Sequence, residues 1–310
     1  MSEMVSVIVP VLNRESLVVK TLDSIIGQTR LPDELIIVDN GSIDNTKQVV
    51  LEWIERNSKK GCHILFLEEK FPGACAARQR GLTVAKGDYV LFFDSDDRMN
   101  SGLISEAKVC AENHLDADII CWPVQIHLLN GKKRKPPFNP EKALENHLIH
   151  GLLRTHGYMI KKDFMTKSGA WTKQLPVWND FELGLRLLLK NPKIIGINKP
   201  LVDVYSQAQS ITGKNFSEKE GQWERSLEEM KKETKISSDC REKRISKIIN
   251  YREVILAANY YKEGNKEGAE KLMRKALAES KCFYKILNRF VYFYTRQGGR
   301  GAWRIVGNFY

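Results

Sequence analysis

The stretch YVLFFDSDD at residues 89–97 decides the fold prediction, because five apolar residues run directly into three carboxylates. An uninterrupted apolar run between polar flanks is typical of a strand that is buried on both faces. Clustered carboxylates repel one another unless a cation lies among them, and hard divalent ions such as Mg²⁺ or Mn²⁺ prefer such oxygen ligands. The stretch therefore predicts a buried strand that ends at a metal-binding edge. The alternative is an acidic, solvated turn that caps the next helix.

The segments before this stretch alternate between strand and helix patterns. Strands are predicted at residues 5–11, 35–38 and 64–67, and helices at residues 17–26, 46–54 and 73–86. This rhythm is typical of a mostly parallel sheet with helices on both faces, in which ligands bind beyond the carboxyl ends of the strands. Three strand ends carry polar groups there, at Pro10–Arg14, Asp39–Ser42 and Asp94–Asp97. The sequence lacks the GxGxxG and GxxxxGK[ST] loops, so a dinucleotide-binding site or a P-loop is disfavoured.

The segments after Asn100 continue the mixed pattern less regularly. Helices are predicted at 103–110, 140–150 and 180–189, and strands at 119–126, 158–160, 194–197 and 201–205. Asn130-Gly131 predicts a hairpin turn that leads into the basic tetrad 132–135, which either contacts an anionic acceptor or is a solvated loop. Asp180 falls at a helix N-terminus, where a simple capping role explains it as well as a chemical one.

Composition places the chain among ordinary soluble globular proteins. Of the 310 residues, 42% are hydrophobic and 28% are charged, and no apolar run reaches the length of a membrane-spanning helix. The first residues lack the basic lead-in of a secretory signal. The six cysteines include no CxxC pair, so we expect reduced thiols in a cytoplasmic protein.

The last third of the chain is helical and basic. Residues 213–310 contain 22 Lys and Arg against 13 Asp and Glu, out of a net charge of +11 for the whole chain. Residues 257–277 resemble one tetratricopeptide repeat, and since one repeat cannot bury its own face we expect it to pack on the preceding domain. A partner-binding role for it stays open.

The segment 281–310 has an apolar stripe at helical spacing beside six basic residues and no acid. A basic amphipathic helix of this kind is typical of an element that lies on an anionic membrane surface. The alternative is a terminal helix that packs its stripe on the core. We expect no nucleic-acid partner.

Residues 4–213 resemble the family-2 inverting glycosyltransferases, which carry the nucleotide-diphospho-sugar fold called GT-A. The similar motifs are residues 7–14, the turn at 35–46, the helix at 73–81 with Gln79 in place of the usual Asn, the strand and DxD motif at 87–97, and Trp178-Asn179-Asp180. The resemblance implies an α/β GT-A domain at residues 1–213 and a helical, basic extension at residues 214–310. It also implies a nucleotide-sugar donor and a glycan or lipid-linked glycan acceptor.

The resemblance also implies roles for single residues. Asp180 would be the general base, Asp96 would bind Mn²⁺ or Mg²⁺, and Trp178 and Asn179 would contact the acceptor. Asp94 would contact the ribose, and Asp97 would support the metal or the sugar. The remaining donor-binding residues would be Pro10, Val11, Asn13, Arg14, Asp39, Arg78, Ser95, Gln207, Ser210 and Thr212.

Two positions depart from the family pattern. Many relatives have a His in the loop after the last strand, and here Gln207 takes its place. All six histidines lie at or before His156, so no later His can serve. Asn179 replaces the acidic first member of the usual pair before the base, which puts the acceptor or sugar contacts in doubt.

The activity that these residues imply is a metal-dependent transfer of a sugar to a hydroxyl group, with inversion. UDP is the default carrier, and bacterial surface polysaccharide synthesis, on the inner face of the membrane, is the expected setting. One alternative is a catalytically inactive relative that acts as a scaffold through its basic helices. A nucleotidyltransferase is disfavoured, because it needs a glycine-rich phosphate loop.

Overall fold

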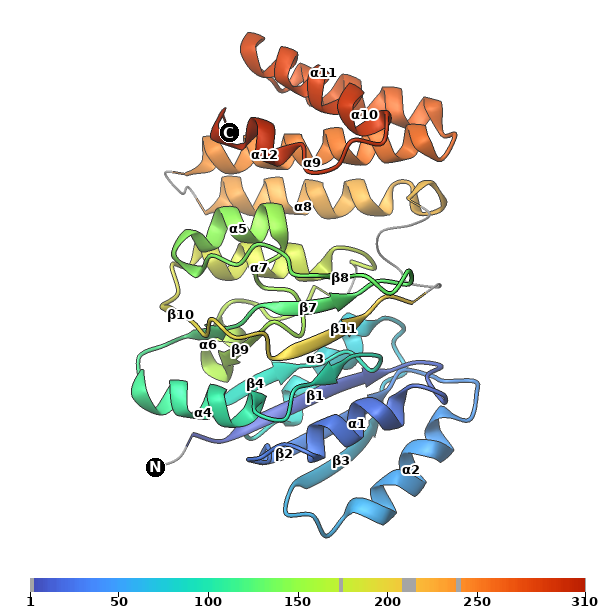
Figure 1. Cartoon of the computed structure of the whole chain (residues 1–310), viewed down its shortest axis with the longest axis vertical. Helices are drawn as coiled ribbons and strands as arrows, with labels where there is room; N and C mark the ends of the chain where they lie inside the picture. The colour runs from blue at the N-terminus through green and yellow to red at the C-terminus, as the bar shows by residue number, and fades with distance from the viewer. Residues whose placement is uncertain (1–2, 173–174, 208–215, 238–240, 310) are drawn as a thin grey trace. The chain divides into compact units, whose positions relative to one another are not determined.

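The computed structural model describes residues 3–172, 175–207, 216–237 and 241–309. The chain forms two compact units, residues 1–208 and residues 209–310 (Figure 1). The first unit is a mixed α/β structure and the second is helical, so the predicted fold class is confirmed. The predicted functional boundary between residues 213 and 214 stays a prediction.

A seven-stranded sheet forms the centre of the first unit, in the order β10-β6-β9-β4-β1-β2-β3. All neighbouring strands in it are parallel except β9, which is antiparallel to β4 and to β6. The strands are β1 (Val5–Val11), β2 (Glu34–Asp39), β3 (His63–Glu68), β4 (Tyr89–Phe92), β6 (Ile119–Cys121), β9 (Tyr158–Lys161) and β10 (Ile194–Gly196).

Helices cover both faces of this sheet because its central strands are apolar on both sides. Val5, Val7 and Val9 of β1 join a core with apolar residues of α1 (Val18–Ile26) and α4 (Leu103–Asn113). On the other face, α3 (Ala74–Val84) approaches β1 at Gly81, where an added Cβ would come within 2.4 Å of Ile8 Cγ2. The close approach explains why glycine stands at this position. The remaining helices of the unit are α2 (Thr46–Asn57), η1 (Pro140–Lys142), α5 (Ala143–His150), α6 (Lys162–Lys167) and α7 (Asn179–Leu189).

A second, four-stranded sheet corrects one prediction. Residues 119–126 are not one strand: β6 ends at Cys121, and β7 (Val124–His127) belongs to the small sheet. Trp122 and Pro123 separate the two strands, and Pro123 cannot donate a ladder hydrogen bond. The small sheet has the order β5-β11-β7-β8, with β5 (Arg98–Met99), β8 (Lys133–Arg134) and β11 (Val202–Tyr205). Part of the basic tetrad thus forms the edge strand β8 of the predicted hairpin.

The second unit consists of helices that pack on one another. They are η2 (Ser217–Lys219), α8 (Gln222–Ile236), α9 (Glu242–Lys262), α10 (Lys266–Ala278), α11 (Cys282–Arg296), α12 (Trp303–Val306) and η3 (Gly307–Phe309). Helix α9 contacts α8, α10 and α11. The α9–α10 pair that resembles one repeat therefore finds its packing partners within its own unit.

Two further findings bear on the class of the protein. Within the described part of the chain, no helix combines the length and the apolar character needed to cross a bilayer. Five cysteines, Cys62, Cys75, Cys110, Cys121 and Cys282, are free thiols.

Candidate functional site

The carboxyl ends of β4, β1 and β2 meet at one edge of the large sheet, because these strands are parallel neighbours. Val11 pairs with Asp39 across the β1–β2 ladder, and Ile8 pairs with Phe92 across the β1–β4 ladder. The three polar segments that follow these strands therefore lie together, as the sequence predicts. Pro10 and Val11 themselves are buried strand residues.

The loops after β1 and β2 are tied together by hydrogen bonds. Asn13 takes a left-handed conformation, with φ at 51°, its N–H donates to Ser42 Oγ at 3.0 Å, and its Oδ1 accepts from Ile43 N at 2.9 Å. Asp39 Oδ2 accepts from the N–H groups of Gly41 and Ser42, both at 3.1 Å. Asp39 Oδ1 is buried and has no hydrogen-bond partner among the described residues. This oxygen can accept a hydrogen bond from a ligand.

Asp94, the first carboxylate after β4, is paired with a buried arginine. Arg78 Nη2 donates to Asp94 Oδ1 at 2.8 Å, and the Arg78 side chain is only 7% exposed. Burial acts to raise the pKa of Asp94, but the positive charges of Arg78 and His156 outweigh it and hold the pKa well below its usual range. Asp94 therefore stays ionised.

Asp97 lies deeper and behaves differently. Its Oδ1 accepts from the N–H of Tyr205 at 2.9 Å, and its side chain is 4% exposed. Burial, together with the charges of Asp94 and Asp96, raises the pKa of Asp97 to about 7. The surroundings thus lower the pKa of Asp94 and raise the pKa of Asp97, although both carboxyls belong to one motif.

Asp96, like Asp94, is partly accessible to a ligand. Its side chain is 21% exposed, and Arg14 Nη2 lies 3.5 Å from its Oδ2. Burial, and then the charge of Asp94, raise the pKa of Asp96 above its usual value. Ser95 between the carboxylates is buried.

His156 is the one residue of this cluster that sequence reasoning did not find. Its Nδ1 lies 3.1 Å from Asp97 Oδ2 and 3.4 Å from Asp94 Oδ2. Continuing the antiparallel register, in which Tyr89 pairs with Lys161, places residue 156 opposite residue 94. A His just before a short strand could have signalled this, but only if the strand's direction had been known. Burial acts to lower the pKa of His156, but the charges of Asp97 and Asp94 raise it overall.

These groups meet the requirements of a divalent cation. One oxygen each from Asp94 and Asp97 and one nitrogen of His156 lie within 4.8 Å of one another. Both ring nitrogens of His156 are buried; Nδ1 faces the two carboxylates, and Nε2 lacks a hydrogen-bond partner among the described residues. Carboxylate oxygens with an imidazole nitrogen are a donor set that suits Mn²⁺ and related ions. The residues therefore fit a metal, either at this cluster or at Asp96 beside it.

The start of α7 is connected to the same edge through Arg78. Arg78 Nη1 lies 3.4 Å from Asn179 Oδ1 and donates to it, and the guanidinium stacks 4.6 Å from the centre of the Trp171 ring. Asp180 follows directly. Burial raises the pKa of Asp180, although the charges of Arg154 and Arg78 oppose the rise. The first turn of α7, which carries Asp180, is thus linked by one side chain to the carboxylate edge.

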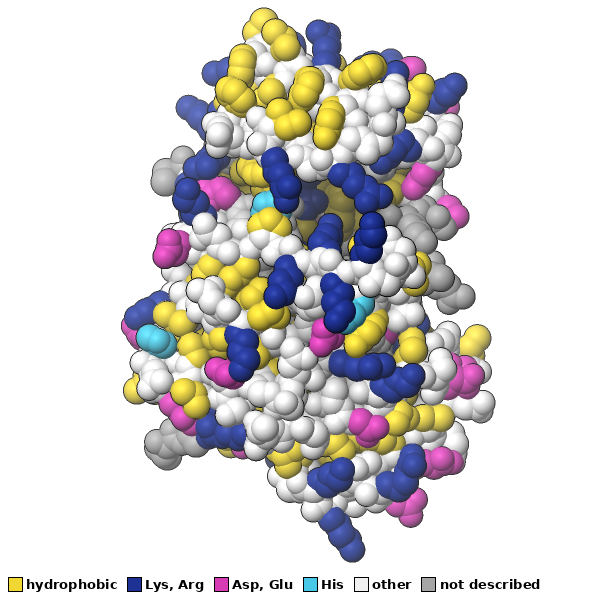
Figure 2. Space-filling model, viewed as in Figure 1, with side chains coloured by type: hydrophobic (Ala, Val, Ile, Leu, Met, Phe, Trp, Pro, Cys, Tyr) yellow, Lys and Arg dark blue, Asp and Glu magenta, His cyan; other side chains and the backbone are white. Residues whose placement is uncertain are grey.

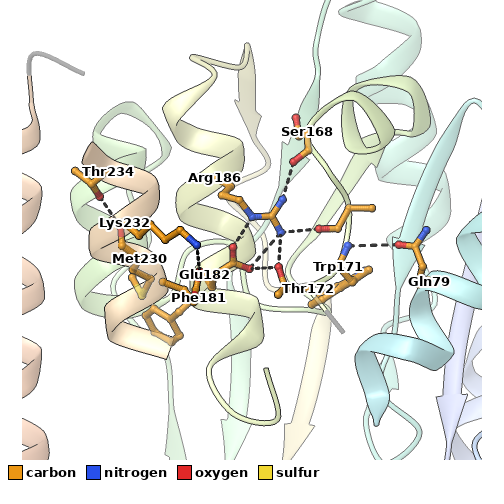
Figure 3. Close-up of polar contacts among 12 residues, drawn as sticks. Gln79, Ser168, Trp171, Thr172, Phe181, Glu182, Arg186, Met230, Lys232 and Thr234 are labelled. Carbon is orange, nitrogen blue, oxygen red and sulfur yellow. Dashed lines mark hydrogen bonds and ion pairs between the residues drawn. The ribbon is translucent and has the colours of Figure 1, made fainter. Parts of the chain in front are cut away.

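A hydrogen-bond network fixes the segment before α7 onto the helix (Figure 3). Arg186 forms an ion pair with Glu182 and donates to the carbonyl oxygens of Ser168 and Ala170, both at 2.6 Å. Thr172 Oγ1 donates to Glu182 Oε2 at 3.1 Å. These contacts hold Trp171 in place beside Arg78. The backbone N–H of Trp171 also donates to Gln79 Oε1 at 3.4 Å, and Gln79 is the residue that departs from the family's helix motif.

The other predicted residues are placed as follows. Trp178 is the N-cap of α7 in a left-handed conformation, with φ at 49°, and both ends of the Asn179 amide are engaged, by Arg78 and by the Leu175 carbonyl. Gln207 follows β11 and is partly exposed. Ser210 and Thr212 lie outside the described residues.

The geometry agrees with the comparison to known families. The profile of "Glycosyl transferase family 2" matches residues 6–174, more than half of the chain. The chain belongs to this family. The expected glycosyltransferase is confirmed at this level, and the matched segment contains the strand ends, Arg78, the three carboxylates and His156.

Individual relatives of this glycosyltransferase extend the comparison. The glycosyltransferase GlyG of Streptococcus pneumoniae is 34% identical over 120 residues, which are 39% of this chain and 38% of GlyG. The cholesterol galactosyltransferase of Borreliella burgdorferi is 26% identical over 215 residues, 63% of this chain and 58% of that protein. The matches thus span less than two thirds of these relatives. The crystal structure of S. aureus TarS residues 1–349 in complex with UDP superposes with a TM-score of 0.64 at 19% identity, covering 95% of this chain and 92% of that 1–349 chain. At this identity the likeness shows the fold.

Proposed function

We propose that this glycosyltransferase moves a sugar from a nucleotide-diphospho-sugar to a hydroxyl group of a glycan or lipid-linked glycan, with inversion at the anomeric carbon. The observation that carries the proposal is the position of Arg78, which bonds Asp94 at the strand ends at 2.8 Å and reaches Asn179 beside Asp180 at 3.4 Å. A donor-binding carboxylate and a candidate base thus lie on either side of one cation. UDP is the proposed carrier, which the UDP complex of the structural neighbour supports.

The general base in this proposal is Asp180. An acceptor hydroxyl is a poor nucleophile until a carboxylate takes its proton. The burial of Asp180 raises its pKa toward the range in which a base works well, while the charges of Arg154 and Arg78 oppose the rise. Because inversion needs the base on the face opposite the leaving group, Asp180 on α7 and the carboxylates after β4 would flank the sugar.

The donor side is assigned to the loops after the strands. Oδ1 of Asp39, which has no partner among the described residues, would accept a hydrogen bond from the nucleobase. The Asn13 loop, Arg14, Arg78 and Asp94 would hold the rest of the nucleotide. A bound Mn²⁺ or Mg²⁺ would neutralise charge that develops on the leaving diphosphate. Asp96 is the proposed ligand. His156 then serves as the positive partner of Asp94 and Asp97, which agrees with its raised pKa.

The metal assignment can be tested separately, because His156 and Asp96 make different predictions. Mn²⁺ affinity is measured by electron paramagnetic resonance in Asp96→Ala and His156→Gln. If Asp96 is the ligand, the first variant loses Mn²⁺ and the second keeps it. Loss in His156→Gln alone would move the ion to the buried cluster.

The biological setting follows the same inference. We propose that the protein acts in the cytoplasm, at the inner face of the membrane, in the synthesis of a surface polysaccharide. Free thiols and the family support this, and the residues at 1–213 would form the catalytic domain.

The reaction is tested by incubating the protein with UDP-hexose, UDP-N-acetylhexosamine and GDP-hexose in the presence of Mn²⁺. Released nucleoside diphosphate is followed over time, and the anomer of the freed sugar is assigned by NMR. We expect slow release from a UDP-sugar, with inversion, even when water is the acceptor. If no donor is consumed, the protein is better explained as an inactive relative that serves as a scaffold.

A further inference from the structure

Helix α11 in the second unit buries little of the apolar stripe that its sequence predicts. Its buried residues are Asn288, Val291 and Thr295, two of which are polar. Asn288 Nδ2 donates to Ser280 Oγ at 3.0 Å, which satisfies the amide inside the unit. A helix of a soluble protein normally buries its apolar stripe. Here the inward face is the poorer of the two in large apolar side chains.

The large apolar side chains of α11 point to solvent instead. Phe283 is 53% exposed, Ile286 66%, Phe290 44% and Phe293 57%. Their spacing of three and four residues, at about 100° per residue, keeps them on one side of the helix. Figure 2 shows hydrophobic side chains gathered on the second unit, over the part where α11 and α12 lie in Figure 1. Scattered apolar residues are common on surfaces, but a contiguous group of large ones marks an interaction site.

The C-terminal turns extend the same surface. The rings of Phe283 and Phe309 lie 5.7 Å apart, and Tyr284 Oη donates to the Phe309 carbonyl at 2.8 Å. Phe309 and Ile305 are each 50% exposed. The turn after α11 and the helix α12 are therefore docked beside the α11 face, so the apolar group is preformed. We call this group, made of Phe283, Ile286, Phe290, Phe293, Ile305 and Phe309, the apolar face.

All charged residues in the segment that carries the apolar face are basic. Residues 281–310 contain no Asp or Glu and six Lys and Arg, namely Lys281, Lys285, Arg289, Arg296, Arg300 and Arg304. Arg296 packs on the ring of Tyr261, 4.4 Å from its centre. Lys285 and Arg289 fall beside the apolar stripe, as the helical period requires.

We propose that the apolar face inserts at the surface of an anionic phospholipid bilayer, with these Lys and Arg side chains at the level of the headgroups. The charge selects the occupant. A second copy of this chain would bring six more cations to the same place, whereas anionic lipid neutralises them. Exposed aromatic and aliphatic side chains next to Lys and Arg are the composition that interfacial helices use. The docking would hold the transferase where a lipid-linked acceptor lies, but it does not depend on the donor site.

The proposal is tested by sedimenting the full chain with vesicles of phosphatidylcholine alone or mixed with phosphatidylglycerol. We expect binding only to the anionic vesicles, weakening as salt rises from about 0.1 M to about 0.5 M because the charges are screened. Ile286→Ser with Phe290→Ser should lower the affinity about tenfold or more, and Lys285→Gln with Arg289→Gln should lower it and remove much of the salt dependence.

Matched controls separate the apolar face from general stickiness. Leu115 is 65% exposed at the end of α4, close to the 66% of Ile286, so Leu115→Ser is the control for the apolar variant. Lys59→Gln with Lys60→Gln, two exposed cations after α2, is the control for charge. Both should bind as the parent does. Equal binding by the α11 variants, or no binding to anionic vesicles, would overturn the proposal. So would a dimer in sedimentation equilibrium that Ile286→Ser abolishes, because the face would then bind a second copy.

Discussion

The carboxylate edge of the sheet and the apolar face of α11 break the usual rule of burial in opposite ways. At the edge, charged groups are inside: Arg78, Asp97 and His156 are each less than 10% exposed. On α11, large apolar groups are outside and polar Asn288 and Thr295 are buried. Both arrangements cost free energy in the isolated protein. We propose the same kind of cause for both, a ligand of matching chemistry: a charged nucleotide at the edge and a lipid surface at α11.

The largest expected effect is on catalysis at the charged edge. Asp180→Asn should slow sugar transfer by about 10²–10⁴-fold, the usual contribution of a general base, while nucleotide binding is unchanged. Asp163→Asn is the matched control, since Asp163 is an exposed acid in the first turn of α6. If Asp180 only stabilises the first turn of α7, both variants will lose a little stability and no activity.

The next effect is on folding. Arg78→Ala should lower the free energy of unfolding by about 3 kcal/mol, because it leaves Asp94 without its buried partner. Arg30→Ala breaks an exposed pair with Glu112 and should cost less than about 1 kcal/mol. Urea denaturation measures both. Equal losses would mean that the charged edge is no more tightly coupled than the surface.

A smaller effect concerns pH. The pKa of Asp97 is raised to about 7 by burial, so the folded protein holds a proton there that the unfolded chain releases near pH 4. The stabilising contribution is complete at low pH and is lost as pH rises toward 7, at no more than about 1.4 kcal/mol per pH unit. Asp97→Asn should remove this slope, so the stability of the parent relative to Asp97→Asn should fall over that window. A difference that is constant with pH, in denaturation curves from pH 4 to 8, would contradict the raised pKa.

The smallest effect is on the stability of variants of helix α11. Ile286→Ser should change the free energy of unfolding by less than about 0.5 kcal/mol, because the side chain is on the surface. Val291→Ala, on the buried face of the same helix, should cost about 2 kcal/mol. If thermal denaturation shows equal costs, the apolar face is packed inside the protein and is not a docking surface.

The strand that ends at Asp94 could be predicted from sequence because five apolar residues and three acids leave few alternatives. The convergence of Asp39 and Asp94 followed, because parallel strands place their carboxyl ends together. His156 could not be predicted, because its position depends on the antiparallel direction of β9. The order of strands along the chain does not reveal that direction. The break at Pro123 was missed because the apolar pattern continues across two sheets.

Helix α11 illustrates a different limit. Its periodicity shows two stripes, but periodicity alone does not say which stripe faces inward. The structure turns Val291 inward between two polar residues, and this orientation depends on packing against α9, which ends about twenty residues earlier in the chain. Arg186 is a similar case: nothing local indicates that it fixes the loop of Trp171.

The most direct test of the nucleotide site is calorimetric titration with UDP and with GDP, each in Mn²⁺ and in EDTA, on the parent, Asp96→Ala and Asp116→Ala. Asp116 is an exposed acid, 68% accessible, away from the strand ends, and serves as the control. We predict metal-dependent binding of UDP that is kept in Asp116→Ala and lost in Asp96→Ala. Absence of binding by either nucleotide in the parent would contradict the donor site and favour the scaffold alternative.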